Sequence, residues 1–238
     1  GGGIGGALCR RFAAGGARAV VVADLDLAAA EAVAAEIGGT AVAADVSDER
    51  QVAALVEASL AAHGQIDVYC SNAGVAFGGG PEAPDQAWRR SWEVHVMAHV
   101  YAARALLPAM LKRGEGCLVG TVSAAGLLNH VLAAPYAASK AAGLSFLEWL
   151  SIAYHDDGIR VCAVCPQGVR TAMLGTGFLA EGALEPEQVA EAVLAGIREE
   201  RFLVLPHPEV ATYFARRAAD QERWLAGMRR LRHRALDE

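Results

Sequence analysis

Short apolar runs rich in Val, Ile and Ala recur along the chain and are separated by stretches with helical periodicity. The runs are continuous rather than alternating, as is typical of strands in a parallel sheet that helices cover on both faces. They span residues 19–23, 40–44, 66–70, 117–122, 160–164 and 202–205. This alternation of strands and helices predicts an α/β fold with a doubly wound parallel sheet of the Rossmann type.

Start and stop signals flank the helical stretches between these runs. One helix is expected over residues 27–37, because a glycine pair follows it. Another is expected over 48–63, with Ser47 as its cap and Gly64 as its stop. Neither an internal repeat nor a linker interrupts the pattern, so residues 1–238 are predicted to form a single domain.

The chain opens on the glycine-rich segment GGGIGG, residues 1–6, and not on a strand. In a doubly wound sheet the strand before such a loop is central, and its loss would split the sheet. We expect the natural protein to carry roughly ten or more residues upstream, including that strand, in line with ordinary strand lengths. An intact mass that matches 238 residues in an active, folded protein would contradict this expectation.

The charge and hydropathy of the chain indicate which classes of partner, nucleic acid or membrane, it can bind. The net charge of −6 argues against a nucleic-acid role, because no basic face dominates. The Arg-rich stretch 229–234 is an exception, which we interpret as a solvated helical tail, with a contact to an acidic partner as the alternative. Since the sequence has no run of eighteen apolar residues and no signal peptide, we expect a cytoplasmic protein without a membrane partner.

We expect no metal site and no redox motif. Cys162 and Cys165 form a C-x-x-C, but they lie in the strand-like run 159–166, where residues three apart point to opposite faces. No second cysteine pair completes a zinc site, so these side chains are predicted to be plain buried thiols. His95 and His99 have the i, i+4 spacing of helical metal ligands, but no third ligand is evident.

Tyr136 and Lys140 are the first candidates for chemistry. They are four residues apart, so on a helix they share a face. A nearby ammonium favours the tyrosinate and would lower the phenol pKa from its ordinary ~10. Ser123 ends the apolar run 117–122, thirteen residues before the tyrosine, where its hydroxyl could hold a substrate oxygen. The three residues predict a base that works near neutral pH.

The glycine-rich start and Asp24 point to a dinucleotide. Glycines at positions 3 and 5 let the backbone approach a pyrophosphate, and a helix expected to begin near Gly6 would offer N–H groups to the anion. Asp24 ends the run 19–23, where its carboxylate could accept hydrogen bonds from ribose hydroxyls and repel a 2′-phosphate. Neither neighbour of Asp24 is basic, which favours NAD over NADP. As the alternative, Asp24 caps the next helix.

Taken together, these residues resemble the short-chain dehydrogenase/reductase family over nearly the whole chain. The matching motifs are Gly3-Ile4-Gly5, Asp24, Asp45-Val46, Ser71-Asn72-Ala73-Gly74, Ser123, Tyr136 with Lys140, and the segment 166–171. The family usually has Asn where this chain has Ser71. The resemblance implies an NAD(P)-dependent oxidoreductase that interconverts a secondary alcohol and its ketone by hydride transfer.

The resemblance also implies a set of cofactor-binding residues. They are Gly3, Ile4, Gly5, Asp24, Leu25, Asp45, Val46, Asn72, Ala73, Gly74, Tyr136, Lys140, Pro166, Gly168, Val169 and Thr171. Asp45 would read the adenine together with the Val46 backbone, or would merely cap the next helix. Val169 and Thr171 would bind the nicotinamide carboxamide. Gln167 stands where the family more often has Gly.

In catalysis, the resemblance implies that Tyr136 is the general base in oxidation and the acid in reduction. Lys140 would lower the phenol pKa and bind the nicotinamide ribose, while Ser123 would orient the substrate oxygen. The family commonly has an Asn, which holds a relay water, at the position of His95. This histidine either relays protons itself or is a packed residue, and both interpretations stay open. We predict that His95→Asn keeps or raises turnover, whereas a hundredfold loss would show that the imidazole is required.

The substrate pocket is expected to be apolar. Its walls are assigned to 77–81, 126–132 and 172–184. The apolar candidates are Leu127, Leu128, Val131, Met173, Leu174, Phe178 and Leu179, and the polar ones, beside Ser123, are Asn129 and His130. Such a pocket suits an apolar secondary alcohol. Alternatively, these residues pack a mobile lid, hinged at 175–177, and touch no substrate.

Two helical stretches, 95–111 and 136–153, carry more apolar surface than one sheet needs. The resemblance implies that these faces pair subunits, so we expect a homotetramer or homodimer. The amphipathic stretch 209–234 is expected to pack into the core, with a cover over the active site as the alternative.

The favoured function is an NAD-dependent dehydrogenase of an apolar secondary alcohol. An NADPH-dependent carbonyl reductase and a non-catalytic NAD(H)-sensing module are the alternatives.

Overall fold

The computed structural model describes residues 1–174 and 180–237 and has the expected α/β architecture. The strands in these ranges are β1 (Val21–Asp24), β2 (Thr40–Ala43), β3 (Val68–Ser71), β4 (Gly116–Thr121), β5 (Ile159–Val164) and β6 (Leu203–Val204). Each of the apolar runs predicted from the sequence overlaps one of them. All of their pairings are parallel, which confirms the predicted sheet type.

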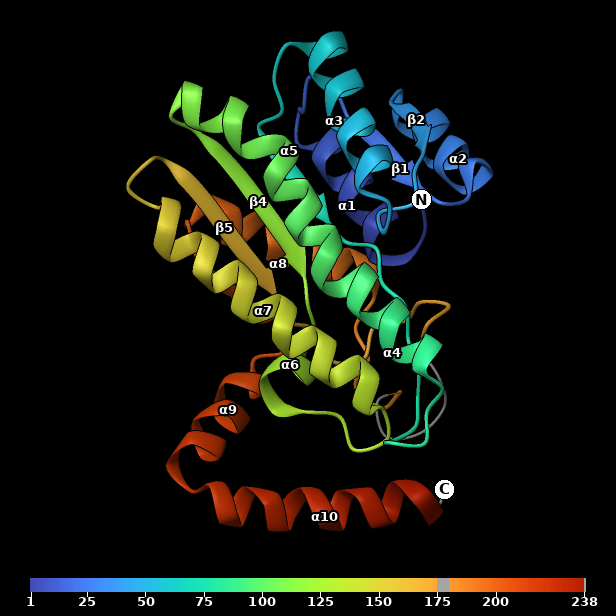
Figure 1. Cartoon of the computed structure of the whole chain (residues 1–238), viewed down its shortest axis with the longest axis vertical. Coiled ribbons are helices and arrows are strands. Elements are labelled where there is room, and N and C mark those ends of the chain that lie inside the picture. Colours follow the sequence, from blue (N-terminus) through green and yellow to red (C-terminus); the bar gives the residue numbers. More distant parts are fainter. Residues whose placement is uncertain (175–179, 238) are drawn as a thin grey trace.

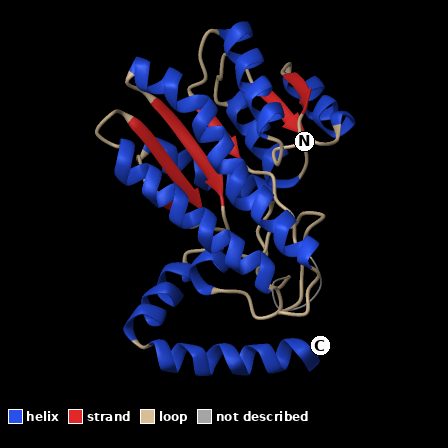
Figure 2. Ribbon diagram, viewed as in Figure 1, coloured by secondary structure: helices blue, strands red, loops and turns tan. Residues whose placement is uncertain are grey.

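Helices cover both faces of the sheet (Figure 2). They are α1 (Gly3–Ala14), α2 (Leu27–Ile37), α3 (Glu49–His63), α4 (Asp85–Trp92), the π-helical turn η1 (Glu93–Met97), α5 (Ala98–Arg113), α6 (Ala124–Leu128), α7 (Ala134–Tyr154), α8 (Pro186–Arg198), α9 (Glu209–Ala219) and α10 (Gln221–Asp237). Buried side chains from α3, α5 and α7 form the core on one face, and those from α1 and α8 form it on the other (Figure 1).

The strands form two separate sheets. One contains β1 and β2, and the other has the order β3-β4-β5-β6. A cavity separates the facing edges and is lined by Val22 on β1 and by Tyr69 and Cys70 on β3. The expected split of the sheet beside the glycine-rich loop is therefore confirmed. The strand that we expect upstream of Gly1 stays a prediction.

The buried cysteines lie on opposite faces of the larger sheet. Cys162 packs in the core with α1 and α8, whereas Cys165 packs in the core with α5 and α7. Both thiols are free and buried, as predicted from the period of the strand.

Local capping chemistry sets the helix ends. Helix α2 matches its predicted bounds, because the Asp26 side chain accepts hydrogen bonds from the first turn and Gly38 takes the left-handed conformation, with φ 66°, at the end. The predicted cap of α3 was wrong. Asp48 caps this helix by accepting from the Arg50 N–H at 2.9 Å, and Ser47 binds Asp45 instead.

A continuous helical stretch, Asp85–Arg113, comprises α4, η1 and α5. It is the one helix among the described residues that is long and apolar enough to cross a membrane by length and composition. In its most apolar window, 56% of the residues are buried inside the protein. Because a core helix of a soluble protein passes the same test, this stretch is weak evidence for a membrane segment.

Candidate active site

Ser123, Tyr136 and Lys140 meet at the carboxyl end of β4. Helix α7 begins at Ala134, so its first turns carry Tyr136 and Lys140 on one face. The Lys140 Nζ lies 5.7 Å from the centre of the Tyr136 ring. Ser123 follows β4 as the cap of α6 and lies close enough to the Tyr136 side chain to lower the pKa of the phenol. The predicted proximity of these three side chains is therefore present.

Burial controls the ionisation of this pair. It raises the pKa of Tyr136 above its ordinary value, and the nearby Ser123 side chain only partly opposes the shift. Burial also lowers the pKa of Lys140 to about 8. For the cofactor-free chain, the net direction of the Tyr136 pKa is therefore the reverse of the lowering expected from Lys140. Burial of the phenol is the main cause.

The glycine-rich loop packs directly against two other predicted cofactor segments. Gly3 has a φ of 50°, and a Cβ there would lie 2.9 Å from the Thr171 Cγ2. A Cβ on Gly5 would lie 2.8 Å from the Asn72 Nδ2. Glycine is thus required at both positions for this close approach. Helix α1 begins at Gly3, slightly earlier than the expected start near Gly6.

Thr121 joins Asn72, in a predicted cofactor segment, to Lys140 of the predicted catalytic pair. Its Oγ1 donates to the Asn72 Oδ1 at 2.9 Å, and its carbonyl oxygen accepts from the Lys140 Nζ at 2.8 Å. Sequence reasoning missed this residue. Its position on β4, two residues before Ser123, was the available signal, because alternate residues of a strand point the same way.

Asp24 lies at the carboxyl end of β1. It does not cap α2, since Asp26 does, so that alternative was wrong. One Asp24 oxygen accepts from the Asp26 N–H at 3.0 Å. Burial opposes ionisation of this carboxyl, whereas the backbone N–H donors of Asp26 and Leu25 favour ionisation and lower its pKa. The carboxylate is therefore ionised at neutral pH.

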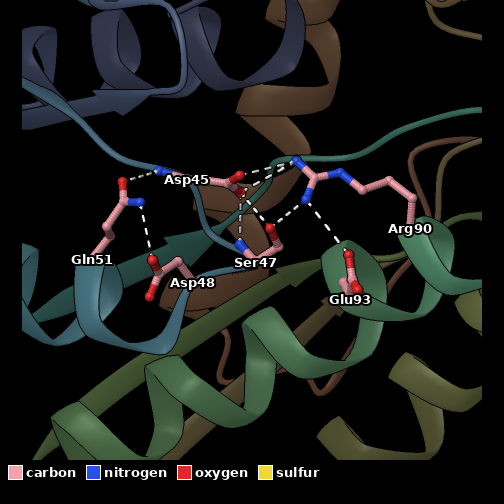
Figure 3. A network of polar contacts seen from close by, with 6 residues as sticks. All are labelled: Asp45, Ser47, Asp48, Gln51, Arg90 and Glu93. Atoms are coloured by element: carbon pink, nitrogen blue, oxygen red, sulfur yellow. Dashed lines mark hydrogen bonds and ion pairs between the residues drawn. The ribbon is translucent and has the colours of Figure 1, made fainter.

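Asp45 belongs to a polar network with Ser47 and Arg90 (Figure 3). It accepts hydrogen bonds from the Ser47 N–H at 2.9 Å and the Ser47 Oγ at 2.6 Å, and the Arg90 guanidinium lies 3.2 Å away. Burial opposes ionisation of this carboxyl, but these donors outweigh it and lower its pKa. Asp45 is not a helix cap, because Asp48 caps α3. Arg90, on α4, was not foreseen as part of this region.

The turn after β5 is held at two points. Val169 pairs with Leu184, where the Arg170 N–H donates to the Leu184 carbonyl at 2.9 Å. The Gln167 N–H donates to the Nδ1 of His207 at 3.1 Å. His207 was also missed by sequence reasoning. Its contact fixes the backbone where Gln167 replaces the more common glycine.

His95 lies beside Tyr136 and Lys140 but inside the core. Its ring is buried and stands edge-on to the Tyr136 ring, with 5.5 Å between centroids. Burial, followed by the positive charge of Lys140, lowers the pKa of His95 to about 2. Of the two interpretations left open, these facts favour the packed residue over the proton relay. The described residues contain no cluster of three potential metal ligands around His95 or elsewhere.

One cavity of about 2530 Å³ connects the predicted cofactor and substrate residues. The predicted catalytic and cofactor residues other than His95 line it, together with three predicted substrate residues: Gly3, Ile4, Gly5, Asp24, Leu25, Asp45, Val46, Asn72, Ala73, Gly74, Ser123, Asn129, His130, Tyr136, Lys140, Pro166, Gly168, Val169, Thr171 and Met173. The cavity also includes the gap between the two sheets.

The substrate end of this cavity is mainly apolar. Phe77, Leu128, Val131, Leu132, Met173 and Leu174 line it. The ring centroid of His130 is 6.3 Å from that of Tyr136, and the Asn129 side chain accepts from the His130 N–H at 2.7 Å. Leu127 was wrongly assigned to the wall, because it is buried in the core. Phe178, Leu179 and the expected hinge at 175–177 lie outside the described residues.

The C-terminal helices are only partly core elements. Tyr213 and Trp224 pack against the core, and the Arg217 guanidinium donates to the Leu127 carbonyl. Helix α10, however, has no buried residue and lies across the end of the molecule below α6 (Figure 1). The expected core packing is therefore confirmed on α10 only for the partly buried Trp224. Trp224 and Met228 of this helix line the cavity. This position agrees with the alternative expectation, in which the C-terminal stretch covers the active site.

Comparison with known proteins decides the family. A family model described as short chain dehydrogenase matches residues 1–181. The chain belongs to the short-chain dehydrogenase/reductase family. This assignment confirms the resemblance and the doubly wound fold, and it makes the protein an NAD(P)-dependent oxidoreductase that acts on CH–OH groups.

This short-chain dehydrogenase is similar to a curated relative and to a solved structure over most of its length. The 1-deoxy-11-β-hydroxypentalenate dehydrogenase of Streptomyces exfoliatus is 36% identical over 221 residues, covering 87% of this chain and 80% of the relative. A Burkholderia phymatum short-chain dehydrogenase/reductase, solved with NAD, superposes with a TM-score of 0.85 at 28% identity over 92% of this chain and 90% of that one.

A further solved neighbour holds both a cofactor and a bile acid. It is a 7α-hydroxysteroid dehydrogenase complexed with NADH and 7-oxoglycochenodeoxycholic acid. It superposes with a TM-score of 0.79 at 26% identity, over 85% of this short-chain dehydrogenase and 88% of the neighbour.

Proposed function

We propose that this protein is an NAD-dependent dehydrogenase that interconverts an apolar secondary alcohol and its ketone. The supporting observation is that Ser123, Tyr136 and Lys140 open into the cavity that the glycine-rich loop and Asp24 line. A bound nicotinamide would supply hydride transfer. The chain's own task is then to place a carbinol carbon and to move the hydroxyl proton.

Each catalytic side chain has a distinct task in this proposal. In its ionised form Tyr136 would accept the hydroxyl proton at its phenolate oxygen during oxidation, and in its protonated form it would donate that proton during reduction. Ser123 holds the substrate oxygen beside the phenol oxygen, because its side chain lies close enough to Tyr136 to influence the phenol pKa. Lys140 is fixed by the Thr121 carbonyl, so its charge stays next to the phenol and the nicotinamide ribose site.

The proposed cofactor is NAD rather than NADP. The ionised carboxylate of Asp24 lies at the strand end where an adenosine ribose is expected, and it would repel a 2′-phosphate. The Asp45 carboxylate, oriented by Ser47 and Arg90, is proposed to face the adenine. Two solved neighbours hold NAD or NADH, which agrees with this choice.

A fluorescence titration followed by a substrate panel tests the proposal. We expect NADH to bind at least tenfold more tightly than NADPH, and NAD-dependent turnover of one or more apolar secondary alcohols. Preference for NADPH would favour the carbonyl reductase and show that Asp24 was misinterpreted. NADH binding without turnover over a broad panel would favour the NAD(H)-sensing module, which His95 at the usual Asn position also suggests.

The residues of helix α10 that line the cavity lead us to propose a more specific substrate class, apolar secondary alcohols that carry a carboxylate. Arg223, Arg230 and Arg234 line the cavity from α10, beside the apolar Trp224 and Met228. These three guanidinium groups form no ion pair with any described residue. Arginines at the edge of an apolar cavity are suited to bind a carboxylate. The names of two relatives, a pentalenate dehydrogenase and one bound to a bile acid, contain such substrates.

A hydroxylated bile acid and its methyl ester test the role of α10. We expect Arg230→Gln/Arg234→Gln to raise KM for the acid about tenfold and to leave KM for the ester unchanged. Only the acid has a carboxylate that the two guanidinium groups can bind. The matched control is Arg229→Gln/Arg232→Gln, which removes the same charge outside the cavity lining. Equal KM values for acid and ester in the unmodified enzyme would contradict the role of α10.

We also propose a homodimer or homotetramer formed through α5 and α7, which lie side by side on one face (Figure 1). Trp149 and Ile152 on α7 are 55% and 77% exposed. Large apolar side chains exposed on one helix are typical of an interface. A cytoplasmic location is proposed because the five cysteines are free, as is usual in a reducing compartment.

A further inference from the structure

His95 connects two parts of the site through both of its ring nitrogens. Its Nε2 accepts a hydrogen bond from the Val75 backbone N–H at 3.1 Å. Its Nδ1 lies 2.8 Å from the Oγ of Ser139. Val75 follows the Asn72–Gly74 segment, and Ser139 lies on α7 between Tyr136 and Lys140. The imidazole therefore connects the backbone after the predicted cofactor segment 72–74 to helix α7.

The partners determine where the proton of the ring lies. A backbone N–H can only donate, so the Nε2 must present a lone pair to Val75. In the neutral ring, the proton is then on Nδ1 and is donated to Ser139. The Ser139 hydroxyl in turn donates to the carbonyl of Pro135, at 2.8 Å, or of Tyr136, at 2.9 Å. A neutral ring satisfies every one of these groups, whereas a second ring proton would face the Val75 N–H.

The surroundings of the ring leave it little freedom. His95 lies in the π-helical turn η1 and is 1% exposed. A Cβ on Gly143 of α7 would lie 2.5 Å from the His95 carbonyl oxygen, so the two backbones are in close contact. A Cβ on Gly74 would lie 3.6 Å from the His95 Nε2 and 3.7 Å from the Lys140 Nζ. Lys140 and His99 both oppose a positive charge on the ring.

We propose that His95 is a positioning residue, a permanently neutral link that holds the backbone after Gly74 against the helix turn carrying Tyr136 and Lys140. It does not relay protons. This inference rests on the proposed function for its kinetic consequences, but the protonation state of the ring can be tested without any activity. The Val75 bond orients the segment beneath the cofactor, and the Ser139 bond orients the first turn of α7.

Nitrogen-15 NMR of the cofactor-free protein tests the ring state directly. Comparison with His95→Gln identifies the His95 signals. We expect a neutral ring with its proton on Nδ1 at every pH from about 5.5 to 8, although an unperturbed histidine titrates near ~6.5. Titration in this range, or a proton on Nε2, would overturn the proposal. Neither result depends on Tyr136 being catalytic, so failure here is distinct from failure of the proposed function.

Two substitutions separate the two bonds. His95→Gln places an amide oxygen near the Nε2 position and keeps an acceptor for Val75, whereas His95→Asn keeps a donor near the Nδ1 position for Ser139. We expect His95→Gln to lower kcat about tenfold with a small change in KM for NAD, because the catalytic turn is loosened. We expect His95→Asn to raise KM for NAD several-fold and to keep kcat, in agreement with the turnover predicted for this variant from the sequence.

A double-mutant cycle completes the test. Ser139→Ala should lower kcat as His95→Gln does, and the two changes together should lower it no further, because they break the same bond. His155→Gln, an exposed histidine near the end of α7, is the matched control and should change neither constant. Additive losses, or a kcat pH profile whose inflections move in His95→Gln, would overturn the proposal. Thermal unfolding of each variant shows whether it folds.

Discussion

At the scale of single residues, burial decides how the acid–base pair ionises. The Tyr136 phenol and the Lys140 ammonium are both removed from water, and each is pushed toward its neutral form. The pKa of Lys140 is lowered to about 8, so this side chain loses its charge above that pH in the cofactor-free protein. Contact between a phenol and an ammonium is therefore not sufficient to produce a tyrosinate at neutral pH.

An ultraviolet difference titration tests this ionisation. The tyrosinate signal lost in Tyr136→Phe should begin to develop only above pH ~10 in the cofactor-free enzyme, because the raised pKa keeps the phenol protonated below it. Ionisation of Tyr136 well below that pH would show that Lys140 outweighs burial. The same titration on Lys140→Met separates the two effects.

At the scale of elements, the site is assembled where the ends of strands meet the starts of helices. Gly5 at the start of α1 lies against Asn72 after β3, and Asn72 is held by Thr121 on β4. Three elements distant in the sequence thus share one chain of contacts. A methyl group added to the glycine-rich loop should therefore displace Asn72 and disturb its contact with Thr121.

The substitution Gly5→Ala tests this chain of contacts. Its Cβ would lie 2.8 Å from the Asn72 Nδ2, so Asn72 must move and lose its bond to Thr121. We expect NADH affinity measured by fluorescence to fall about tenfold, the cost of roughly one hydrogen bond. Gly227→Ala on α10, where only a flexible arginine lies within 4 Å, is the control for NADH binding. Unchanged affinity in Gly5→Ala would contradict the role of this contact.

Sequence reasoning found the residues that stand at the ends of elements. Ser123, Asp24 and the loop glycines each follow or precede a periodic apolar run, so position and residue type together revealed them. Thr121 and Ser139 were missed because their partners are side-chain and backbone atoms brought close only by packing. The pKa direction of Tyr136 was wrong for the same reason, since burial depth is a property of the tertiary structure.

At the scale of the whole molecule, the two sheets and the C-terminal helices enclose one continuous cavity. The predicted cofactor residues line one part of it, and the apolar wall with α10 lines the other. Ser123 and Tyr136 lie where these parts meet. A dinucleotide and an alcohol that enter from the two sides would therefore bring their reacting atoms together beside the Tyr136 hydroxyl.

The most direct test of the proposed function is to compare NADH binding and turnover in Tyr136→Phe. The substrate is any secondary alcohol that the unmodified enzyme oxidises. We predict that kcat falls by about 10³, the scale of general acid–base catalysis, while NADH affinity stays within about twofold because only one hydroxyl is removed. If Tyr136→Phe retained turnover within tenfold of the unmodified enzyme, Tyr136 would not be the proton-transfer group.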